Sequence, residues 1–284
     1  MIQVIDTFVY YGPNPIKKTD HTVDMIRDRY EELKKEGIEM RCIVMPTGPQ
    51  INDRLIDVYS ALPGIVLGTL PQINPNPKFT KYYSYTPAEE IRRLADQEHV
   101  VGFKHNTPWN QVPIDSTLLG EIVGVLEQYG LPLTLHCSRE IGKSDWDGYE
   151  RCKTFLDFFR GVLNCAHAGG LSEEKIESMQ KLGKEYGDRV FYNSAGLSGE
   201  DSRYDSQDGT EMPRSMNPEE FIDITEKLVK SIPDQFVFGS DWPELQNWTL
   251  EPFKQLLDER RITQGEFEKV MWKNAMKLFP RINR

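Results

Sequence analysis

The stretch LTLHCS, residues 133–138, shows the pattern on which the fold prediction rests. Its first residues form a short, mostly apolar run, typical of a strand buried on both faces, and a histidine stands where that run ends. Similar runs recur along the chain, each followed by polar side chains. They predict seven further strands at Ile2–Ile5, Met40–Met45, Ile65–Leu70, Val100–Lys104, Val162–Ala166, Val190–Asn193 and Phe236–Gly239.

Helical patterns separate most of these strands. Capping boxes predict helices over residues 86–95 and 263–278, and similar starts predict helices over 173–186 and 218–229. Strands that alternate with helices indicate βα units and a parallel sheet. Eight such units predict an α/β fold, a closed (β/α)8 TIM barrel, with residues 1–284 forming a single domain because no linker divides the chain.

The amino-acid composition argues against several classes of function. The chain has 284 residues and a net charge of −10, with no basic stripe that would suit nucleic acid. Its four cysteines form no C-x-x-C pair, and no signal peptide or membrane-length apolar run is present. We therefore expect a cytoplasmic protein with a small-molecule partner. A homodimer is compatible with the loops that carry Leu and Trp.

Two segments interrupt the alternation of strands and helices. Residues 71–85 are rich in Pro, Asn and Tyr, and residues 195–216 are too long for an ordinary connection in a compact domain. The second segment is either a lid over the site or an irregular surface insertion.

Polar residues gather at the predicted strand ends. In a parallel barrel the active site lies at the carboxyl ends of the strands, so these residues are expected to share one site. Three of the five histidines, His105, His136 and His167, follow apolar strands, and Asp241 follows the last one. The other two histidines, at positions 21 and 99, fall away from this face and are expected at the surface.

The chain resembles the amidohydrolase-related family that includes decarboxylases, hydratases and lactone hydrolases. The resemblance spans nearly the whole chain, in family order. It rests on VIDTFVYYGP (4–13), VVGFKHN (100–106), LTLHCS (133–138), NCAHAGG (164–170), VFGSDWP (237–243) and NAMKLF (274–279). The family fold is a distorted (β/α)8 barrel, so the resemblance implies a single-domain distorted TIM barrel here.

The resemblance also implies site residues, with one departure. Members of the family carry an H-x-H metal motif on the first strand, and this chain has Phe8 and Tyr10 there. His136 and Asp241 match two other family metal ligands, and His167 matches an acid/base or substrate-polarising histidine. Because a catalytic zinc normally has three protein ligands, we expect a divalent metal such as Zn²⁺ or Mn²⁺ to be bound weakly or not at all.

The remaining side chains favour acid–base chemistry on a small carbonyl substrate. Asp241 is predicted as the general base, with His167 and His136 polarising or protonating the substrate. Several other residues are expected to bind a carboxylated substrate or to form the walls of its site: Lys104, His105, Arg139, Tyr10, Trp109, Trp242 and Asn193. Cys137 is expected to point away from the site if His136 points into it.

These residues favour a hydrolase that acts on an ester, a lactone or, less readily, an amide. Two alternatives stay open. One is a metal-dependent decarboxylase or other lyase, in which His136 and Asp241 hold the ion. The other is a catalytically silent binding protein on the same barrel, although burying three titratable groups at its mouth costs free energy unless they pair.

Overall fold

The computed structural model describes residues 1–14, 19–80, 84–137, 149–169, 173–195, 218–243 and 250–283. Within these ranges its strands are β1 Ile2–Asn14, β2 Thr19–His21, β3 Ile38–Pro46, β4 Val66–Thr69, β5 Gln72–Ile73, β6 Phe103–Asn106, β7 Leu133–His136, β8 Leu163–Cys165, β9 Val190–Asn193 and β10 Phe236–Val237. The predicted loop at 195–216 falls almost wholly outside the described residues.

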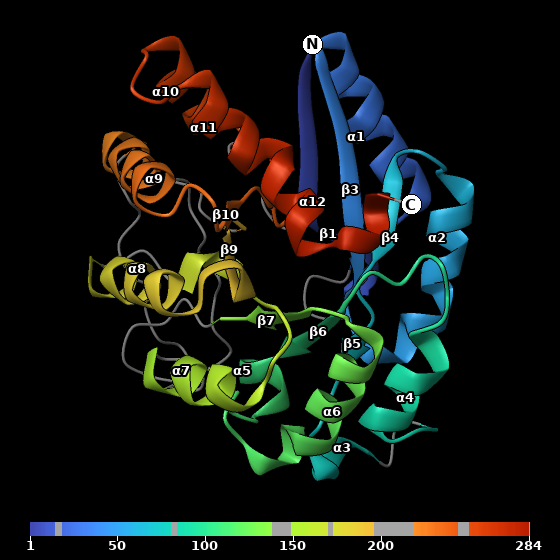
Figure 1. The fold of residues 1–284 in the computed structure, drawn as a ribbon. Coiled ribbons are helices and arrows are strands. Elements are labelled where there is room, and N and C mark those ends of the chain that lie inside the picture. Colours follow the sequence, from blue (N-terminus) through green and yellow to red (C-terminus); the bar gives the residue numbers. More distant parts are fainter. Residues whose placement is uncertain are drawn as a thin grey trace, which may run out of the picture.

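Helices surround these strands (Figure 1). They are α1 Val23–Lys35, α2 Leu55–Ala61, α3 Pro77–Thr80, α4 Pro87–Leu94, α5 Thr107–Asn110, α6 Gly120–Tyr129, α7 Tyr149–Phe158, α8 Glu173–Tyr186, α9 Pro218–Ser231, α10 Glu251–Asp258, α11 Gln264–Glu268 and α12 Asn274–Leu278. In the part of the chain that the structure describes, no helix is both long enough and apolar enough to cross a bilayer.

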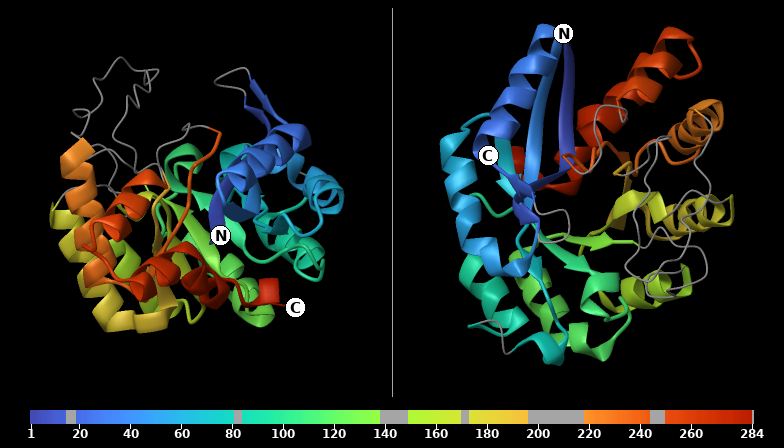
Figure 2. Two further views of the ribbon diagram at one scale, coloured as in Figure 1. Left: turned by 90° about the horizontal axis from the view of Figure 1, so that it is seen from above. Right: turned by 180° about the vertical axis from the view of Figure 1, so that it is seen from behind.

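The strands form a distorted TIM barrel made of two parallel arcs. One arc has the order β2-β1-β3-β4, with β2 antiparallel, and the other has the order β10-β9-β8-β7-β6-β5. Backbone hydrogen bonds join the arcs at both seams. The amide of Thr7 donates to Phe238 O (3.1 Å) across the first seam, and the amide of Val101 donates to Thr69 O (3.1 Å) across the second. The two views of Figure 2 show the helices outside the strands.

The predicted caps form as expected where they are described. Thr86 and Thr263 each accept a hydrogen bond from the backbone of the N3 glutamate, whose side chain bonds back to the cap. Beyond α11 the helix continues through a π-helical segment, Lys269–Lys273, into α12.

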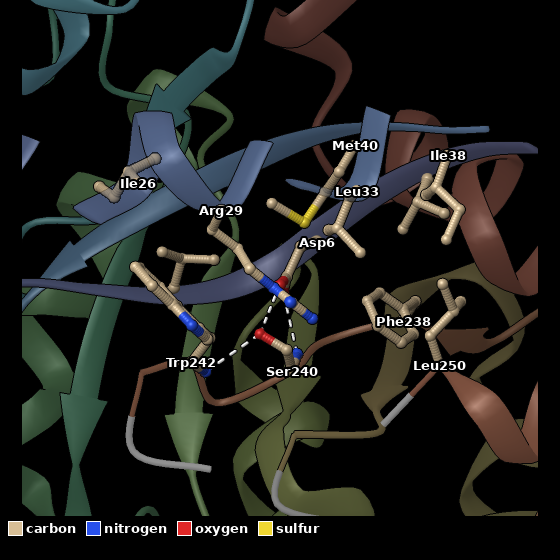
Figure 3. A pocket seen from close by; sticks show the side chains of 12 residues that line it. Asp6, Ile26, Arg29, Leu33, Ile38, Met40, Phe238, Ser240, Trp242 and Leu250 are labelled. Atoms are coloured by element: carbon tan, nitrogen blue, oxygen red, sulfur yellow. Dashed lines mark hydrogen bonds between the residues drawn. The ribbon is translucent and has the colours of Figure 1, made fainter. Parts of the chain in front are cut away.

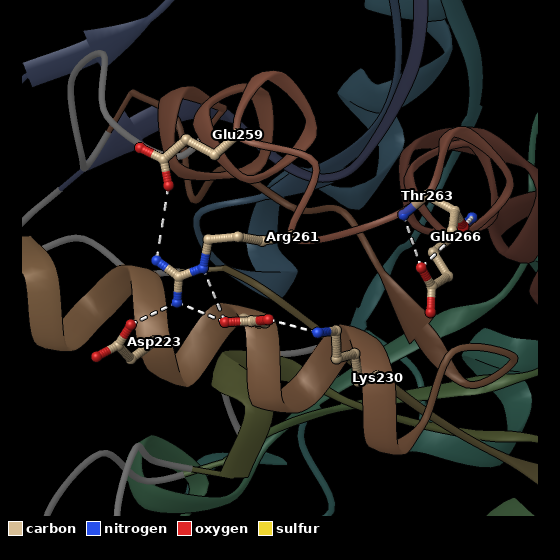
Figure 4. A network of polar contacts seen from close by, with 7 residues as sticks. Asp223, Lys230, Glu259, Arg261, Thr263 and Glu266 are labelled. Atoms are coloured by element: carbon tan, nitrogen blue, oxygen red, sulfur yellow. Dashed lines mark hydrogen bonds and ion pairs between the residues drawn. The ribbon is translucent and has the colours of Figure 1, made fainter.

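An ion-pair network centred on Arg261 connects the segment between α10 and α11 to α9. Arg261 pairs there with Asp223 and Glu226 (Figure 4).

The first strand is much longer than predicted. We expected it to end at Ile5, but β1 runs to Asn14. The prediction was wrong because a register shift in the pairing of β1 with β3, between Asp6 and Val9, lets the strand continue, and β2 then pairs with its far end. This extension places Phe8 and Tyr10 inside the barrel.

The inside of the barrel is apolar below the site. Side chains from both arcs form one cluster there: Phe8, Ile43, Met45, Leu70, Val101, Ala166, Phe191, Ala195 and Val237, closed by Leu278 and Phe279 of the last helical segment. A larger cluster lies between the strands and the helices and contains Cys137, so this cysteine packs outward as predicted.

Candidate active site

Two histidines meet at the ends of β7 and β8. The Nε2 atom of His167 lies 3.0 Å from Nδ1 of His136, and the ring centroids are 4.3 Å apart. His136 is half-buried, whereas His167 is 2% exposed and lies behind it. The structure therefore brings together two of the three histidines predicted to share a site.

A carbonyl fixes the position of one proton in this pair. Nδ1 of His167 lies 2.8 Å from the carbonyl oxygen of Ala195. Because a carbonyl oxygen only accepts, Nδ1 of His167 must carry the hydrogen. In the neutral pair, Nε2 of His167 then accepts from Nδ1 of His136, which leaves the lone pair of His136 on its Nε2 atom.

The backbone at His167 and Asp241 has an unusual conformation. Their φ angles are 60° and 64°, in the left-handed region that non-glycine residues seldom adopt. Such a conformation costs about 1–3 kcal/mol and is found most often at functional sites. At His167, the Oδ1 atom of Asn193 supports the turn by accepting from the amides of His167 and Ala195, both at 3.1 Å.

Asn193 was predicted to bind substrate. The structure places its side chain in the interior, fully buried, with Oδ1 used by the backbone. Its visible role is to position His167.

Asp241 lies beside the first strand. Its amide donates to Phe8 O (3.0 Å), and the Phe8 ring packs against His167 at a centroid distance of 5.4 Å. The carboxylate is buried, with 4% of the residue exposed. Asp241 thus belongs to the same end of the barrel as the histidine pair.

A buried lysine completes this group. Nζ of Lys104 donates to Oη of Tyr10 at 2.7 Å, and only 1% of Lys104 is exposed. The ammonium also lies over the rings of Phe8 and Tyr10. Lys104 and Tyr10, both predicted as substrate-binding residues, therefore form one unit that joins β6 to β1.

His105 does not face this site. It is fully buried, with Nε2 3.1 Å from Val112 O and Nδ1 2.9 Å from the side-chain amide of Asn110. Adjacent strand residues point to opposite faces, so Lys104 faces inward and His105 outward. The expectation that His105 joins a shared site fails for this reason.

The remaining predicted residues are dispersed. Trp109 is 49% exposed, on α5. Trp242 packs on the outer side of β1, where it lines a cavity with Asp6, Ser240 and apolar side chains of α1 (Figure 3). It is therefore not a wall of the barrel mouth. Arg139 lies outside the described residues.

The two histidines expected at the surface are buried instead. His21 and His99 are each 3% exposed, so that prediction was wrong. His99 is held by Oγ1 of Thr69 at 2.8 Å and by Oε1 of Gln97 at 2.7 Å. Both ring nitrogens thus have partners, which explains how an imidazole can be buried there.

Asp6 was not singled out as a site residue, although it holds the mouth in shape. Its Oδ1 atom accepts from the amides of Phe8 (3.1 Å) and Ser240 (2.9 Å), and Oδ2 contacts the Ser240 hydroxyl (Figure 3). The carboxylate therefore connects β1 to the residue before Asp241. A short polar pair, Ser240-Asp241, directly after the last strand was the only trace of this connection in the sequence.

Removing the Asp6 carboxylate is expected to weaken the fold. Asp6→Ala leaves three buried donors without their acceptor, at about 1 kcal/mol each, so the free energy of unfolding should fall by about 3 kcal/mol. Asp6→Asn keeps one acceptor oxygen and should lose less than half of that. Urea denaturation of both variants checks this; equal losses in the two would contradict the role of the Asp6 oxygens.

The buried His105 predicts a pH dependence of stability. Burial lowers the pKa of His105 from 6.5 to about 4, so the unfolded state takes up this proton first. The contribution of neutral His105 to the free energy of unfolding is present above pH 6.5. It falls by about 3 kcal/mol as the pH is lowered to 4. We expect the stability advantage of wild type over His105→Gln to shrink by that amount between pH 7 and pH 4, measured by urea denaturation.

The comparison with a variant is needed because Asp6 acts in the opposite direction. Burial raises the pKa of Asp6 from 3.8 to about 6, so the folded state takes up this proton first and gains stability as the pH falls between those values. The two effects partly cancel in wild type. A difference between wild type and His105→Gln that stays constant with pH would contradict the neutral, buried His105.

Comparisons with known proteins now place the chain. The sequence model of the amidohydrolase family matches residues 17–281. The chain belongs to the amidohydrolase family. No curated protein matches it.

Several solved structures share the fold of this amidohydrolase. One is 5-carboxyvanillate decarboxylase from Sphingomonas paucimobilis, with 15% identity, a TM-score of 0.63 and 99% of both chains covered. Another is 2,6-dihydroxybenzoate decarboxylase from Rhizobium, with 13% identity, a TM-score of 0.65 and 99% of both chains covered. A third is 4-oxalomesaconate hydratase from Rhodopseudomonas palustris, with 12% identity, a TM-score of 0.66, and 99% of this chain and 96% of that one covered.

This chain carries only some of the residues that bind metal in the family it resembles. Among the described residues, no group of three or more His, Cys, Asp or Glu side chains is arranged to hold a metal ion. Phe8 supplies no ligand atom, and the hydroxyl of Tyr10 accepts a hydrogen bond from Lys104. The ligand atoms of the described residues therefore do not fit the ion that the resemblance implies, and we assign no chemical step to a metal.

Proposed function

We propose that this amidohydrolase-family chain is a hydrolase that opens a small carboxylated ester or lactone. The observation that carries the proposal is the hydrogen-bond chain from Ala195 O through His167 to His136. It gives His136 a lone pair on Nε2, on the ring that is partly exposed. A neutral imidazole in this state is suited to take a proton from an attacking water.

The buried pair also stabilises the proton once it is taken. When His136 becomes an imidazolium, its Nδ1–H can donate to His167, whose own Nδ1–H remains bonded to the Ala195 carbonyl. Charge-assisted hydrogen bonds of this kind are about twice as strong as neutral ones. The same proton is then available for the leaving alcohol.

The buried cation on β6 suits the charge that forms on the substrate. Water attack on an ester carbonyl places a negative charge on its oxygen, and a fixed donor in a buried site stabilises that charge. Lys104, bonded to Tyr10, supplies such a donor. A carboxylate elsewhere on the substrate would be attracted by the same charge.

The role of Asp241 separates two versions of this proposal. The sequence prediction makes Asp241 the general base, whereas the hydrogen-bond chain favours His136. If His136 is the base, Asp241→Asn retains measurable turnover, whereas His136→Gln loses most of it. The opposite order would assign proton transfer to Asp241.

A second candidate function is decarboxylation. The observation that favours it is that two of the similar structures are decarboxylases, on the same fold. There His136 would act as an acid, in its protonated form, and Lys104 would stabilise an electron-rich intermediate.

The proton balance of turnover distinguishes the two reactions. The protein as purified, and the same protein after chelation, would both be assayed against aromatic and unsaturated lactones, esters and acids that carry carboxylates, in weak buffer with a pH indicator. Ester or lactone hydrolysis at neutral pH releases a proton. Decarboxylation of a carboxylate takes up a proton and yields CO₂, which is swept out and trapped before it can hydrate to bicarbonate and return that proton. We expect proton release without CO₂. Release of CO₂ as the main product would overturn the hydrolase and support the lyase, and no turnover of any member would support the silent barrel.

A further inference from the structure

Two aromatic rings enclose the ammonium of Lys104. Nζ lies 4.4 Å from the centroid of the Phe8 ring and 4.3 Å from that of the Tyr10 ring. The rings meet edge to face, with centroids 5.5 Å apart and an interplanar angle of 89°. The ammonium also donates a hydrogen bond to Oη of Tyr10, so it contacts both Phe8 and Tyr10 of the first strand.

This arrangement is specific for a positive charge. Burying an ammonium is costly, so it persists only where the surroundings favour the cation. The Phe8 ring attracts a desolvated cation near its centroid, and the phenol oxygen of Tyr10 accepts one of the three ammonium protons. An apolar residue at position 104 would use neither the Phe8 ring nor the Tyr10 oxygen. The enclosure is therefore a built site for charge and not merely packing.

The two ring-bearing positions are those of the first-strand metal motif. Phe8 and Tyr10 stand where the family resemblance places the H-x-H histidines, and both side chains turn toward Lys104. We propose that the Lys104 ammonium replaces the metal ion as the fixed cation of this barrel and binds the oxyanion of a carboxylated substrate. The oxyanion part of this inference rests on the proposed function, whereas the replacement part does not.

Electrostatics predicts that the ammonium and a divalent ion exclude each other. A divalent ion and an ammonium a few ångströms apart repel each other strongly when little water lies between them. Restoring histidines at positions 8 and 10 should therefore not restore metal binding while Lys104 remains. Removing the lysine charge should.

Zn²⁺ titration tests the replacement without any substrate. Four proteins would be compared by isothermal titration calorimetry after chelation and dialysis: wild type, Lys104→Met, Phe8→His/Tyr10→His, and the triple variant that combines these changes. Circular dichroism and thermal unfolding confirm that each is folded. Methionine matches the length of the lysine stem without its charge.

We expect the triple variant to bind Zn²⁺ at least 100-fold more tightly than Phe8→His/Tyr10→His. Tight binding of one equivalent by wild type would overturn the proposal. So would equal affinity of the double and triple variants, whether weak or tight. If either variant with altered rings does not fold, Phe8→His and Phe8→His/Lys104→Met give the same comparison with the Tyr10 ring intact. There we expect an increase of at least 10-fold in Zn²⁺ affinity, and no increase would overturn the proposal.

The Zn²⁺ affinities do not depend on which reaction the protein catalyses. If the chain proves to be a lyase, the Zn²⁺ result still decides whether Lys104 has replaced the ion. If the Zn²⁺ result fails, the hydrolase assignment still depends on the proton balance of turnover.

Discussion

His136→Gln is expected to lower kcat/KM by about 10²–10⁴-fold, the range that a general base contributes. Glutamine keeps a polar group near the position of Nε2 of the imidazole but cannot take a proton from water. The hydrogen bond from Nδ1 of His136 to His167 (3.0 Å) would be lost or weakened as well. The steady-state kinetics of the variant, on the substrate found in the proton-balance assay, measure this loss.

A second histidine variant serves as the control. His99 is buried, like His167, but it bonds to Thr69 and Gln97 away from the barrel mouth. His99→Gln should lose stability and keep kcat within a few-fold of wild type. If His136→Gln retains more than a tenth of the wild-type kcat/KM, while thermal unfolding shows it folded, the general-base role of His136 is wrong.

Lys104→Met is expected to lower kcat by about 10²–10³-fold, as removal of one oxyanion donor does in other enzymes. The effect should appear in kcat more than in KM if the ammonium meets the charge that develops during the reaction. Because the ring faces of Phe8 and Tyr10 remain, a buried thioether replaces the charge without a large cavity. Stopped assays over a range of substrate concentrations separate kcat from KM.

The control for this variant is a lysine of the outer helices. Lys254→Met removes a charge whose side chain is 30% exposed and pairs with Glu251. Its kinetics should match wild type, because exposed ion pairs contribute less than about 1 kcal/mol. A Lys104→Met enzyme with unchanged kcat and raised KM would show that the ammonium only binds the ground-state carboxylate.

Much of the fold could be predicted because it depends on local patterns. The strand at 133–136 and the helix at 173–186 are predicted with the bounds that the structure has, and both capping boxes form. The length of β1 could not be predicted in this way. Its continuation depends on a register shift against β3 and on pairing with β2, and both are tertiary contacts.

The structure brings His136 and His167 together, as the sequence predicted, but it places His105 elsewhere. Strand alternation, applied correctly to His136 and Cys137, also separates Lys104 from His105, and only the lysine then faces inward. Applying that rule to both pairs shows that Lys104 and His105 cannot both face inward, and the register of β6 against β7, which pairs Asn106 with His136, then decides that Lys104 does. Lys104 and Tyr10, which are joined by a hydrogen bond, lie 94 positions apart in the sequence. No local sequence pattern could therefore predict that Phe8 and Tyr10 surround the lysine. Trp242 turns outward after Asp241, whose left-handed backbone the sequence does not reveal.

The most direct test of the central claim is nitrogen-15 NMR of histidine-labelled protein, which reports the protonation of each ring nitrogen. Only five histidines are present, and spectra of His136→Gln and of a His167 variant would assign the pair. At neutral pH the account predicts protonated Nδ1 atoms on both His136 and His167, with both Nε2 atoms unprotonated. A protonated Nε2 on His136 in the resting protein would contradict it, since that ring could not then accept a proton from water.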